Sequence, residues 1–542
     1  MSFLDHLIIM PILLPLGAAA LTLLFDDTRR EIKAGINFAA TILLVAVAIA
    51  LLMQTDAVTR EGTELTVTYQ LGNWPAPFGI VLVADRLSAI MVLLAGILGI
   101  NALIYSMARW QAAGPHFHML FQMLLMGLNG AFLTGDLFNL FVFFEVMLAA
   151  SYGLLLHGSG VLRVRAGLHY IAINLAASSL FLIGVSLIYG VTGTLNMADL
   201  ALRIPHVPAN DLGLLHAGAA ILGIAFLVKA GMWPLNFWLP TTYAAASAPV
   251  AGLFAIMTKV GVYIVLRLTL LLFGEHAGAS FGFGQTFLMI GGLATIAFGT
   301  VGVLASQSTG RLAGYSVLVS SGTLLAAIGM GDRAVTGGLL FYLVSSTLTI
   351  SAFLMLVELI ERARVAGADV LAVTMEAYGE DDEELEHEEE VGVVIPSTMA
   401  ILGVCFALCG LLLSGVPPFS GFISKFAMLS AVLQSEDAAS PIPASTWWLI
   451  GLLIISGLAS LIAMTRTGIA TFWATLEGQT PSVRVIEIAP IAILIALCLG
   501  LTVAGGPVLR FMDLAADALH TPTDYIEDII GTTPAAHAGG AS

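Results

Sequence analysis

Long apolar segments recur from one end of the 542-residue chain to the other, with only short polar breaks between them. A transmembrane helix needs about 20 consecutive, mainly apolar residues. By this criterion the sequence predicts an all-α polytopic membrane protein with about fourteen spanning helices. We expect them near residues 3–25, 33–53, 80–107, 116–134, 137–157, 165–191, 213–246, 248–273, 282–305, 311–330, 334–361, 396–435, 446–475 and 485–507.

Two of these segments, 213–246 and 396–435, are too long for one simple crossing. The first contains Pro234, and the second contains the pair Pro417 and Pro418. Proline removes a backbone donor and clashes with the preceding turn, so polar backbone groups at membrane depth then need water or protein partners. Interrupted helices at corresponding places in two halves are typical of inverted-repeat transporters.

The cations outside the predicted apolar core fall into two groups on opposite sides of the bundle. The larger group comprises Arg29, Arg30, Lys33, Arg109, Arg163, Arg165, Arg311, Arg362, Arg364, Arg466 and Arg484, and the smaller one Arg60, Arg86, Arg203, Arg267, Arg333 and Arg510. The positive-inside rule makes the larger group cytoplasmic. We therefore expect a multi-pass protein of the cell inner (cytoplasmic) membrane with both termini external and with Lys33 in an ordinary cytoplasmic loop.

Two connecting segments differ from the rest. Segment 54–79 is polar and rich in β-branched residues, which favours a short external hairpin. Segment 365–394 contains the acidic run EAYGEDDEELEHEEE and is expected to be cytoplasmic. Such a run is usually a solvated loop, and a cation-collecting or docking role is the alternative.

Composition narrows the functional classes. The chain is 58 % hydrophobic and only 10 % charged, whereas soluble domains carry about one quarter charged residues. No Lys/Arg stripe is interleaved with aromatic residues, so nucleic-acid binding has no support. Cys405, Cys409 and Cys498 lie in apolar segments without a CxxC motif. We therefore predict no metal site and no cofactor.

Three of the four lysines, Lys229, Lys259 and Lys425, lie within predicted spans. A lysine in the bilayer core costs about 2.5 to 3.5 kcal/mol on insertion scales, so such residues normally face a bundle interior or a wet cavity. Burial lowers the pKa of an ammonium by up to about 3 to 5 units, whereas the pKa of arginine stays above about 12. These lysines are therefore predicted to load and release protons, with a purely structural role as the alternative.

One clear mid-helix carboxylate, Glu145, lies in the same predicted bundle. Close to Lys229 it would stay ionised and titrate with that lysine as a pair, which makes it a candidate modulator of proton release. Asp136 precedes the same helix, where the ordinary explanation is an N-terminal cap. We keep Asp136 as a secondary candidate for proton transfer.

These residues lie in motifs that resemble the antiporter-like subunits shared by Mrp (Pha) monovalent cation/proton antiporters and respiratory complex I. The resemblance covers roughly residues 80–475 and rests on the glutamate in FFEVM, the lysines in FLVKAGMWPLNFWLP, MTKVGVY and GVPPFSGFISKF, and the sequence GRLAGYS. Within that family the first lysine motif and the short C-terminal tail are most similar to the D subunit of Mrp/Pha systems. A hetero-oligomeric complex, exchanging Na+ or K+ for protons, is therefore implied.

The resemblance also implies an organisation in two inverted five-helix repeats, each with a broken helix. The expected parts are 1–115 with three helices, 116–273 as the first repeat, 282–475 as the second, and 476–542 with the last helix and an external tail. Glu145 and Lys229 would form the charged pair, Lys259 the central relay, and Lys425 the far-side proton donor or acceptor.

The predicted eleventh helix departs from many relatives, which carry a histidine and a lysine there. Here it reads FYLVSSTLTISAFLML, so hydroxyls such as those of Tyr342 and Ser346, with ordered water, would have to carry protons. The leading hypothesis is a proton-translocating antiporter subunit. The alternatives are a proton-pumping subunit of a complex I-type or membrane hydrogenase oxidoreductase, and a non-transporting scaffold.

Overall fold

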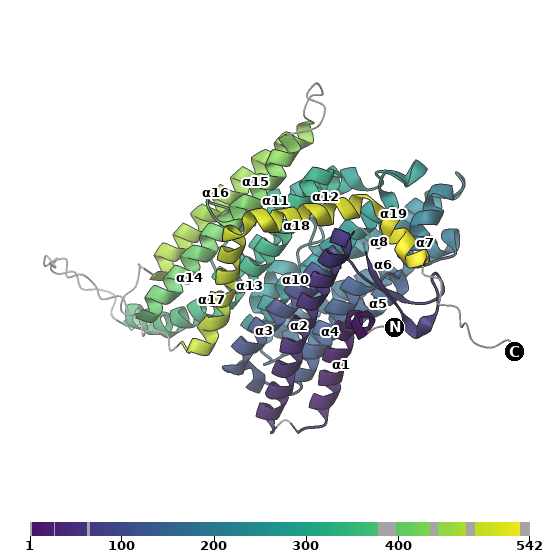
Figure 1. Ribbon diagram of the computed structural model, residues 1–542. Coiled ribbons are helices and arrows are strands. Elements are labelled where there is room, and N and C mark those ends of the chain that lie inside the picture. Colours follow the sequence, from purple (N-terminus) through teal and green to yellow (C-terminus); the bar gives the residue numbers. More distant parts are fainter. Residues whose placement is uncertain are drawn as a thin grey trace.

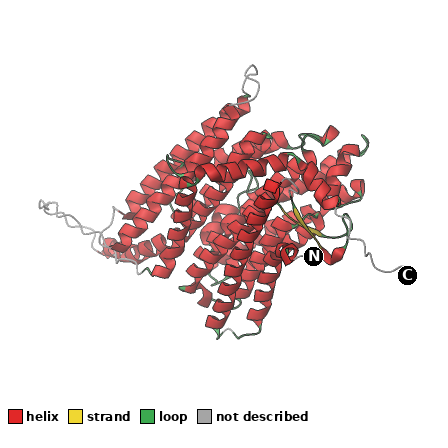
Figure 2. Cartoon of the chain, viewed as in Figure 1, coloured by secondary structure: helices red, strands yellow, loops and turns green. Residues whose placement is uncertain are grey.

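The computed structural model describes residues 3–26, 28–61, 66–377, 397–433, 443–472 and 483–531. These residues form a bundle that is helical almost throughout (Figures 1 and 2). The α-helices are α1 (Met10–Leu23), α2 (Arg30–Glu61), α3 (Arg86–Met107), α4 (Phe117–Leu133), α5 (Leu137–Leu156), α6 (Val161–Thr192), α7 (Met197–Arg203), α8 (Leu212–Ala230), α9 (Leu239–Ala245), α10 (Ala248–Phe273), α11 (Gln285–Ala305), α12 (Thr309–Met330), α13 (Arg333–Ala377), α14 (Ser397–Ser414), α15 (Ser420–Leu433), α16 (Ala444–Phe472), α17 (Val485–Val503), α18 (Gly505–His520) and α19 (Pro522–Ile530).

Twelve helices of the described chain are long and apolar enough to cross a membrane, and α1, α4 and α15 are shorter apolar helices. The polytopic all-α prediction is confirmed, although the count of fourteen spans is not. Helix α10 coincides with the predicted segment 248–273 and is buried along its whole length. Because it contacts α3, α8, α12 and α13, α10 is the central helix of the bundle.

The two over-long segments each form two helices. Helix α8 ends at Ala230 and α9 begins at Leu239, while α14 ends at Ser414 and α15 begins at Ser420. A glycine with positive φ follows each first half, Gly231 at 75° and Gly415 at 74°. Left-handed glycines commonly end helices because they carry no Cβ.

A two-stranded antiparallel sheet joins α2 to α3. Strand β1 (Val67–Gln70) pairs with β2 (Val81–Ala84) in the register Val67 to Ala84. Strand β1 lies in segment 54–79, but β2 takes the first residues of the predicted helix 80–107, which begins instead at Arg86. Residues 62–65 of that segment lie outside the described residues.

The chain after residue 504 forms two helices where the sequence predicted only a tail. Helix α18 runs across one end of the bundle, and α19 continues from it (Figure 1). Helix α18 packs mainly on α13, with Met512, Ala515, Ala516 and Leu519 buried at helical spacing. The span-length criterion missed α18 because its apolar face is an amphipathic stripe on a 16-residue helix.

Two other predictions need correction or fall outside the described residues. Lys33 is not in a loop: it lies in the first turn of α2, and its side chain is only 6 % exposed. Helix α13 continues to Ala377, so the first part of segment 365–394 is helical. Residues 378–396, which hold most of the acidic run, lie outside the described residues.

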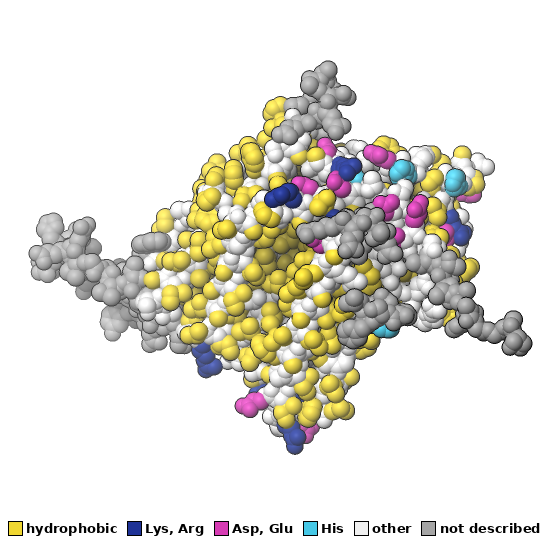
Figure 3. All heavy atoms as spheres, viewed as in Figure 1, with side chains coloured by type: hydrophobic (Ala, Val, Ile, Leu, Met, Phe, Trp, Pro, Cys, Tyr) yellow, Lys and Arg dark blue, Asp and Glu magenta, His cyan; other side chains and the backbone are white. Residues whose placement is uncertain are grey.

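Members of the two cation groups lie at opposite ends of α3. Arg109 follows the last turn of α3, whereas Arg86 is the first residue of that helix. Arg362 and Arg484 join the network around the α3 end near Arg109, and Arg267 lines a cavity with Arg86, α18 and α19. Between the two ends, the surface in Figure 3 is largely hydrophobic, as expected of a lipid-facing belt.

Candidate functional site: a line of buried lysines and hydroxyls

The first part of the site lies between α5, α6 and α8. Glu145 on α5 accepts a hydrogen bond from the Ser178 hydroxyl on α6. Lys229, in the last turn of α8, donates from Nζ to Asn174 Oδ1 on α6 at 2.8 Å, and it is 2 % exposed. The Glu145 carboxylate and the Lys229 ammonium are therefore both hydrogen-bonded to side chains of α6, Ser178 and Asn174, which lie one helical turn apart.

Glu145 and Lys229 line the same small cavity of about 10 Å³, together with Asn174 and Ser178. Among these described residues no ion pair within 4.0 Å joins the carboxylate to the ammonium. A cavity of this size is close to what one water molecule needs. One bridging water would be enough to pass a proton between the two groups.

The second part of the site surrounds Lys259, in the middle of α10. Its side chain is fully buried, and Nζ donates to Ser320 Oγ on α12 at 2.7 Å. The Ser320 hydroxyl donates in turn to Ser346 Oγ on α13 at 3.0 Å. A hydroxyl both donates and accepts, so this chain of contacts is suited to proton relay.

A cavity of about 20 Å³ continues the line beyond Ser320. Its walls include the predicted candidates Tyr342 and Ser346, and also Ser345 on the same helix. Ser345 Oγ lies 2.8 Å from Ser420 Oγ, at the first residue of α15. The cavity therefore brings α12, α13 and the second half of the second broken helix together around hydroxyl groups.

Lys425 lies one turn further along α15. Its Nζ donates to the carbonyl oxygens of Leu413, at 3.4 Å, and Ser414, at 3.2 Å, which end α14. The carbonyl end of a helix carries partial negative charge and favours a cation. Lys229 differs in this respect, because it lies in the last turn of α8 itself and its Nζ donates to Asn174 on α6 and not to the carbonyls that end α8.

Close packing brings the two central lysine helices together. A Cβ added at Gly261 on α10 would come within 2.7 Å of the Ala230 nitrogen on α8. This glycine lies two residues from Lys259, and Ala230 follows Lys229. Only a residue without a side chain allows the two backbones to approach so closely at this level.

Asp136 has the ordinary role of a cap. Its carboxylate accepts from the Asn139 backbone N–H at 2.8 Å, at the start of α5. Burial raises the pKa of Asp136, and the hydrogen bonds from the Asn139 and Phe138 N–H groups only partly offset it. The structure does not bring Asp136 into contact with any of the three lysines.

Comparison with known proteins identifies the family. A family model described as "NADH:quinone oxidoreductase/Mrp antiporter, TM" matches residues 134–458. The chain belongs to this family. It is 61 % identical over 98 % of its length to a protein of Rhizobium meliloti (strain 1021) named as the D subunit of a probable K(+)/H(+) antiporter, covering 98 % of that protein. It is 33 % identical to a protein of Alkalihalophilus pseudofirmus named as the D subunit of an Na(+)/H(+) antiporter, covering 97 % of this chain and 99 % of that one.

Solved structures share the fold. A chain of the Mrp complex from Dietzia sp. DQ12-45-1b is 24 % identical with a TM-score of 0.80, and the match covers 98 % of this chain and all of that one. A chain of respiratory complex I from Thermus thermophilus is 19 % identical with a TM-score of 0.72, covering 96 % and 99 %. The predicted resemblance to antiporter-like subunits, and to the D subunit among them, is confirmed.

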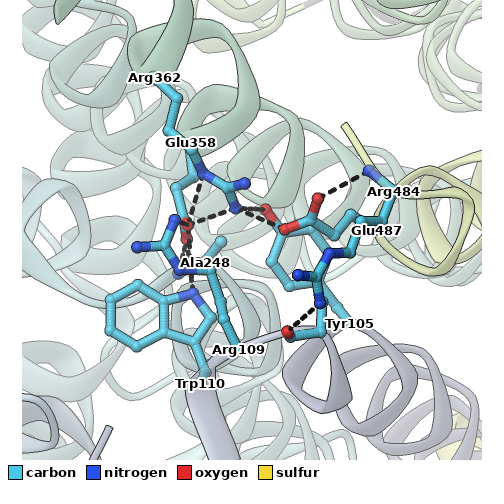
Figure 4. A network of polar contacts seen from close by, with 9 residues as sticks. Tyr105, Arg109, Trp110, Ala248, Glu358, Arg362, Arg484 and Glu487 are labelled. Atoms are coloured by element: carbon cyan, nitrogen blue, oxygen red, sulfur yellow. Dashed lines mark hydrogen bonds and ion pairs between the residues drawn. The ribbon is translucent and has the colours of Figure 1, made fainter. Parts of the chain in front are cut away.

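A polar network that the sequence did not predict fixes the N-terminal end of α10 in this Mrp-type chain (Figure 4). Glu358 on α13 accepts from the Ala248 N–H, the first of α10, at 3.1 Å, and from Trp110 Nε1 at 2.9 Å. Arg362 then joins Glu358 at 2.7 Å to Glu487 on α17 at 2.8 Å. The helix that carries Lys259 is therefore capped by a carboxylate of α13 that also binds Trp110 and Arg362.

A second ion pair holds the other end of α10. Arg267 contacts both carboxylate oxygens of Asp85, the cap of α3, at 2.5 and 2.8 Å. Both side chains are at least nine-tenths buried, and Tyr263 Oη accepts a further bond from Arg267. Asp85 and Arg267 are 182 residues apart, so the sequence did not indicate that these two side chains form a pair.

The described residues hold no group of three or more His, Cys, Asp or Glu side chains arranged to bind a metal ion. The three cysteines are buried and free. The lysine, glutamate and hydroxyl side chains described above are groups that can hold or pass a proton.

Proposed function

We propose that this chain is the proton-translocating subunit of a multi-subunit monovalent cation/proton antiporter. Glu145, Lys229, Lys259 and Lys425 are the residues that carry the proton. The observation that carries the proposal is the connection from Lys259 through Ser320 to the hydroxyl-lined cavity, which reaches the helix of Lys425.

The proposed path has a storage site in each half of the chain and a relay between them. Lys229 exchanges its proton with the cavity that it shares with Glu145. Lys259 passes protons through Ser320 and Ser346 to the second cavity. Lys425 receives them at the break between α14 and α15. The repeats 116–273 and 282–475 each supply one broken helix.

The proposed setting is the cell inner (cytoplasmic) membrane, with both termini external. The end of the bundle that holds Arg109 and Arg362 is then cytoplasmic, because it belongs to the larger cation group. The end covered by α18 faces outside. Protons enter from the external side and a cytoplasmic cation leaves through the assembled complex.

Potassium is the first cation to test, since the relative of 61 % identity is named for K(+). Relatives of 32 % and 33 % identity are named for Na(+). Exchange is therefore measured with both cations. Their names also specify one part of a larger assembly, which supports the proposal that the chain works within a hetero-oligomer.

A redox-driven pump is the principal alternative. Two solved relatives from such complexes are 22 % and 19 % identical, and at this identity they show the fold alone. Purifying the native complex decides between the two: bound flavin or iron–sulfur subunits would overturn the antiporter proposal.

The test of the path replaces Lys259 in the complete complex. Lys259→Met keeps the length of the side chain without the charge, and Lys259→Arg keeps the charge on a group that does not release its proton. Both variants are expected to abolish cation-dependent proton movement in everted membrane vesicles. Arg165→Lys, at an exposed position of α6, is the control and should leave exchange unchanged.

Assembly is checked by co-purification of the partner subunits with each variant. A scaffold role predicts normal assembly and unchanged exchange for both Lys259 variants. That result would exclude the proposed path, because Lys259 is its central link.

A further inference from the structure

Another polar cavity lies where α1 ends and α2 begins, next to the start of α4. It is lined by Thr22, Leu23, Arg30, Lys33, Gln111, Gly114, His116, Phe117, His118 and Met119. Two cationic side chains and two histidines therefore converge on it, and no carboxylate is among its described lining residues. None of the proposed proton-carrying residues is part of this cavity.

The N-terminus of α4 opens into this cavity. His116 precedes the helix with φ of 61° and makes no capping hydrogen bond through its side chain. The first three residues of α4, Phe117 to Met119, all line the cavity. Their N–H groups have no carbonyl partner within the helix, and they form the positive end of its dipole. Such an end is suited to bind an anion.

His118 supplies the independent observation. Its side chain is 4 % exposed, and Nε2 has no hydrogen-bond partner among the described residues. Asn37 Nδ2 donates to His118 Nδ1 at 2.9 Å. Gln122 Nε2 donates both to the Asn37 backbone carbonyl, at 3.2 Å, and to Asn37 Oδ1, which sets the orientation of the Asn37 amide. Since His118 Nδ1 accepts, its Nε2 carries hydrogen and needs an acceptor.

We propose that this cavity binds a phosphate-type anion, supplied by the headgroup of an anionic phospholipid. The anion accepts from His118 Nε2 and the first N–H groups of α4, and the exposed Arg30 offsets its charge. Each of these groups is a donor, and phosphate offers only acceptors in this setting. This inference does not depend on the proposed proton path.

The surroundings favour a lipid as the source of the anion. The enclosed part of the cavity, about 20 Å³, is little more than one water molecule needs, so it admits a phosphate oxygen and leaves the rest of the headgroup at the mouth, where Leu23 and Arg30 are exposed. Leu23 forms part of the wall, and Leu21, Leu24 and Ile32, near it in sequence at the end of α1 and the start of α2, carry exposed apolar side chains, with Leu24 77 % exposed. Acyl chains would lie along these residues. Basic pockets between spans on the cytoplasmic side commonly bind anionic headgroups.

A bound headgroup would join the α1–α2 hairpin to α4, the first helix of the first proposed repeat. At the lower end of this hairpin Figure 3 shows Lys/Arg and Asp/Glu side chains next to the hydrophobic surface. The anion would therefore stabilise the contact between the N-terminal helices and the rest of the bundle.

The test measures the thermal unfolding midpoint of the purified full chain in a neutral detergent. The probes are short-chain phosphatidylglycerol, short-chain phosphatidylcholine and sodium phosphate. Phosphatidylglycerol is expected to raise the midpoint in a saturable way, and phosphatidylcholine is not. Arg30→Gln is expected to raise the half-saturating concentration about fivefold, which corresponds to the loss of one cation near the headgroup.

Arg29→Gln is the matched control, because Arg29 is an exposed neighbour that does not line the cavity. It should leave the half-saturating concentration unchanged, and Arg30→Lys should restore it. Equal effects of Arg29→Gln and Arg30→Gln, or of the two lipids, would overturn the proposal. An equal shift with sodium phosphate at the same concentrations would keep the anion site and replace the lipid by soluble phosphate.

Discussion

Replacing Asp85 by asparagine tests whether the buried pair with Arg267 holds the central helix in place. Asparagine caps helices about as well as aspartate, so the cap of α3 on the Ser88 N–H, now 2.8 Å, should persist. The substitution removes only the negative charge. It leaves the guanidinium of Arg267 buried without its counter-charge, two turns from Lys259 on α10.

The magnitude follows from the burial of the pair. Removing one partner of a buried ion pair costs about 3 to 5 kcal/mol, because the remaining charge is uncompensated. Unfolding entropy is about 2.1 cal/mol/K per residue, or about 1.1 kcal/mol/K for 542 residues. Asp85→Asn should therefore lower the thermal midpoint of the purified chain by about 3 to 4 °C at pH 7.

Asp136→Asn is the matched control, because Asp136 also caps a helix but makes no ion pair among the described residues. Burial raises the pKa of Asp136, so its charge destabilises the folded state once the pH rises through that pKa. Its asparagine variant should be neutral or slightly stabilised at pH 7. If Asp85→Asn lowers the midpoint no more than Asp136→Asn does, the pair does not hold α10.

The pH dependence gives a second check on Asp85. Burial acts to raise the pKa of Asp85, but the charge of Arg267 and the hydrogen bonds from Arg267 and Ser88 outweigh it and keep the pKa below its usual value. The stability from the pair is therefore fully present above the unfolded pKa of about 3.9 and is lost as the pH falls through the folded pKa. The gap between wild type and Asp85→Asn should narrow on acidification below about pH 4. A gap that stays constant would contradict the assignment.

Two further variants test the relay and the packing around it. Ser320→Ala leaves Lys259 without its hydroxyl acceptor, at a cost of about 1.5 to 3 kcal/mol, so exchange in vesicles should slow by about tenfold or more, while Ser320→Thr should retain it. Equal rates for Ser320→Ala and Ser320→Thr would remove the hydroxyl from the path. Gly261→Ala places a Cβ 2.7 Å from the Ala230 nitrogen and should destabilise the chain by about 1 to 3 kcal/mol in a thermal melt. Gly223→Ala, with open space around its Cβ, should not, and a similar loss for both would mean that close packing is not the cause.

The sequence predicted the spans and the core lysines well because both are local consequences of the bilayer. Segment 248–273 could be identified from length and hydropathy alone, since every residue of a spanning helix must lie in an apolar stretch. The breaks at Pro234 and Pro417 were equally visible, because proline disrupts a helix wherever it lies. Lys229, Lys259 and Lys425 were conspicuous because lipid excludes charge.

The partners of those lysines could not be predicted in the same way. The sequence indicated that hydroxyls on the eleventh predicted helix would have to carry protons, but it did not indicate that Ser320 on α12 connects them to Lys259. Strand β2, with 4 residues, and helix α18, with 16, were also missed, because the span-length criterion recognises only apolar segments of about 20 residues. Lys33 was placed in a loop because its burial depends on α4 packing beside it.

By itself the sequence determined that this chain crosses a membrane many times, that two of its helices are broken, and that three ammonium groups lie in its interior. These features follow from the thickness of the bilayer and from the cost of charge within it, which act on each segment separately. Only the tertiary structure decided that Glu358 caps α10, that Asp85 pairs with Arg267, and that α12, α13 and α15 share a cavity. Those contacts depend on which helices meet across the bundle, and side-chain packing between distant segments settles that choice.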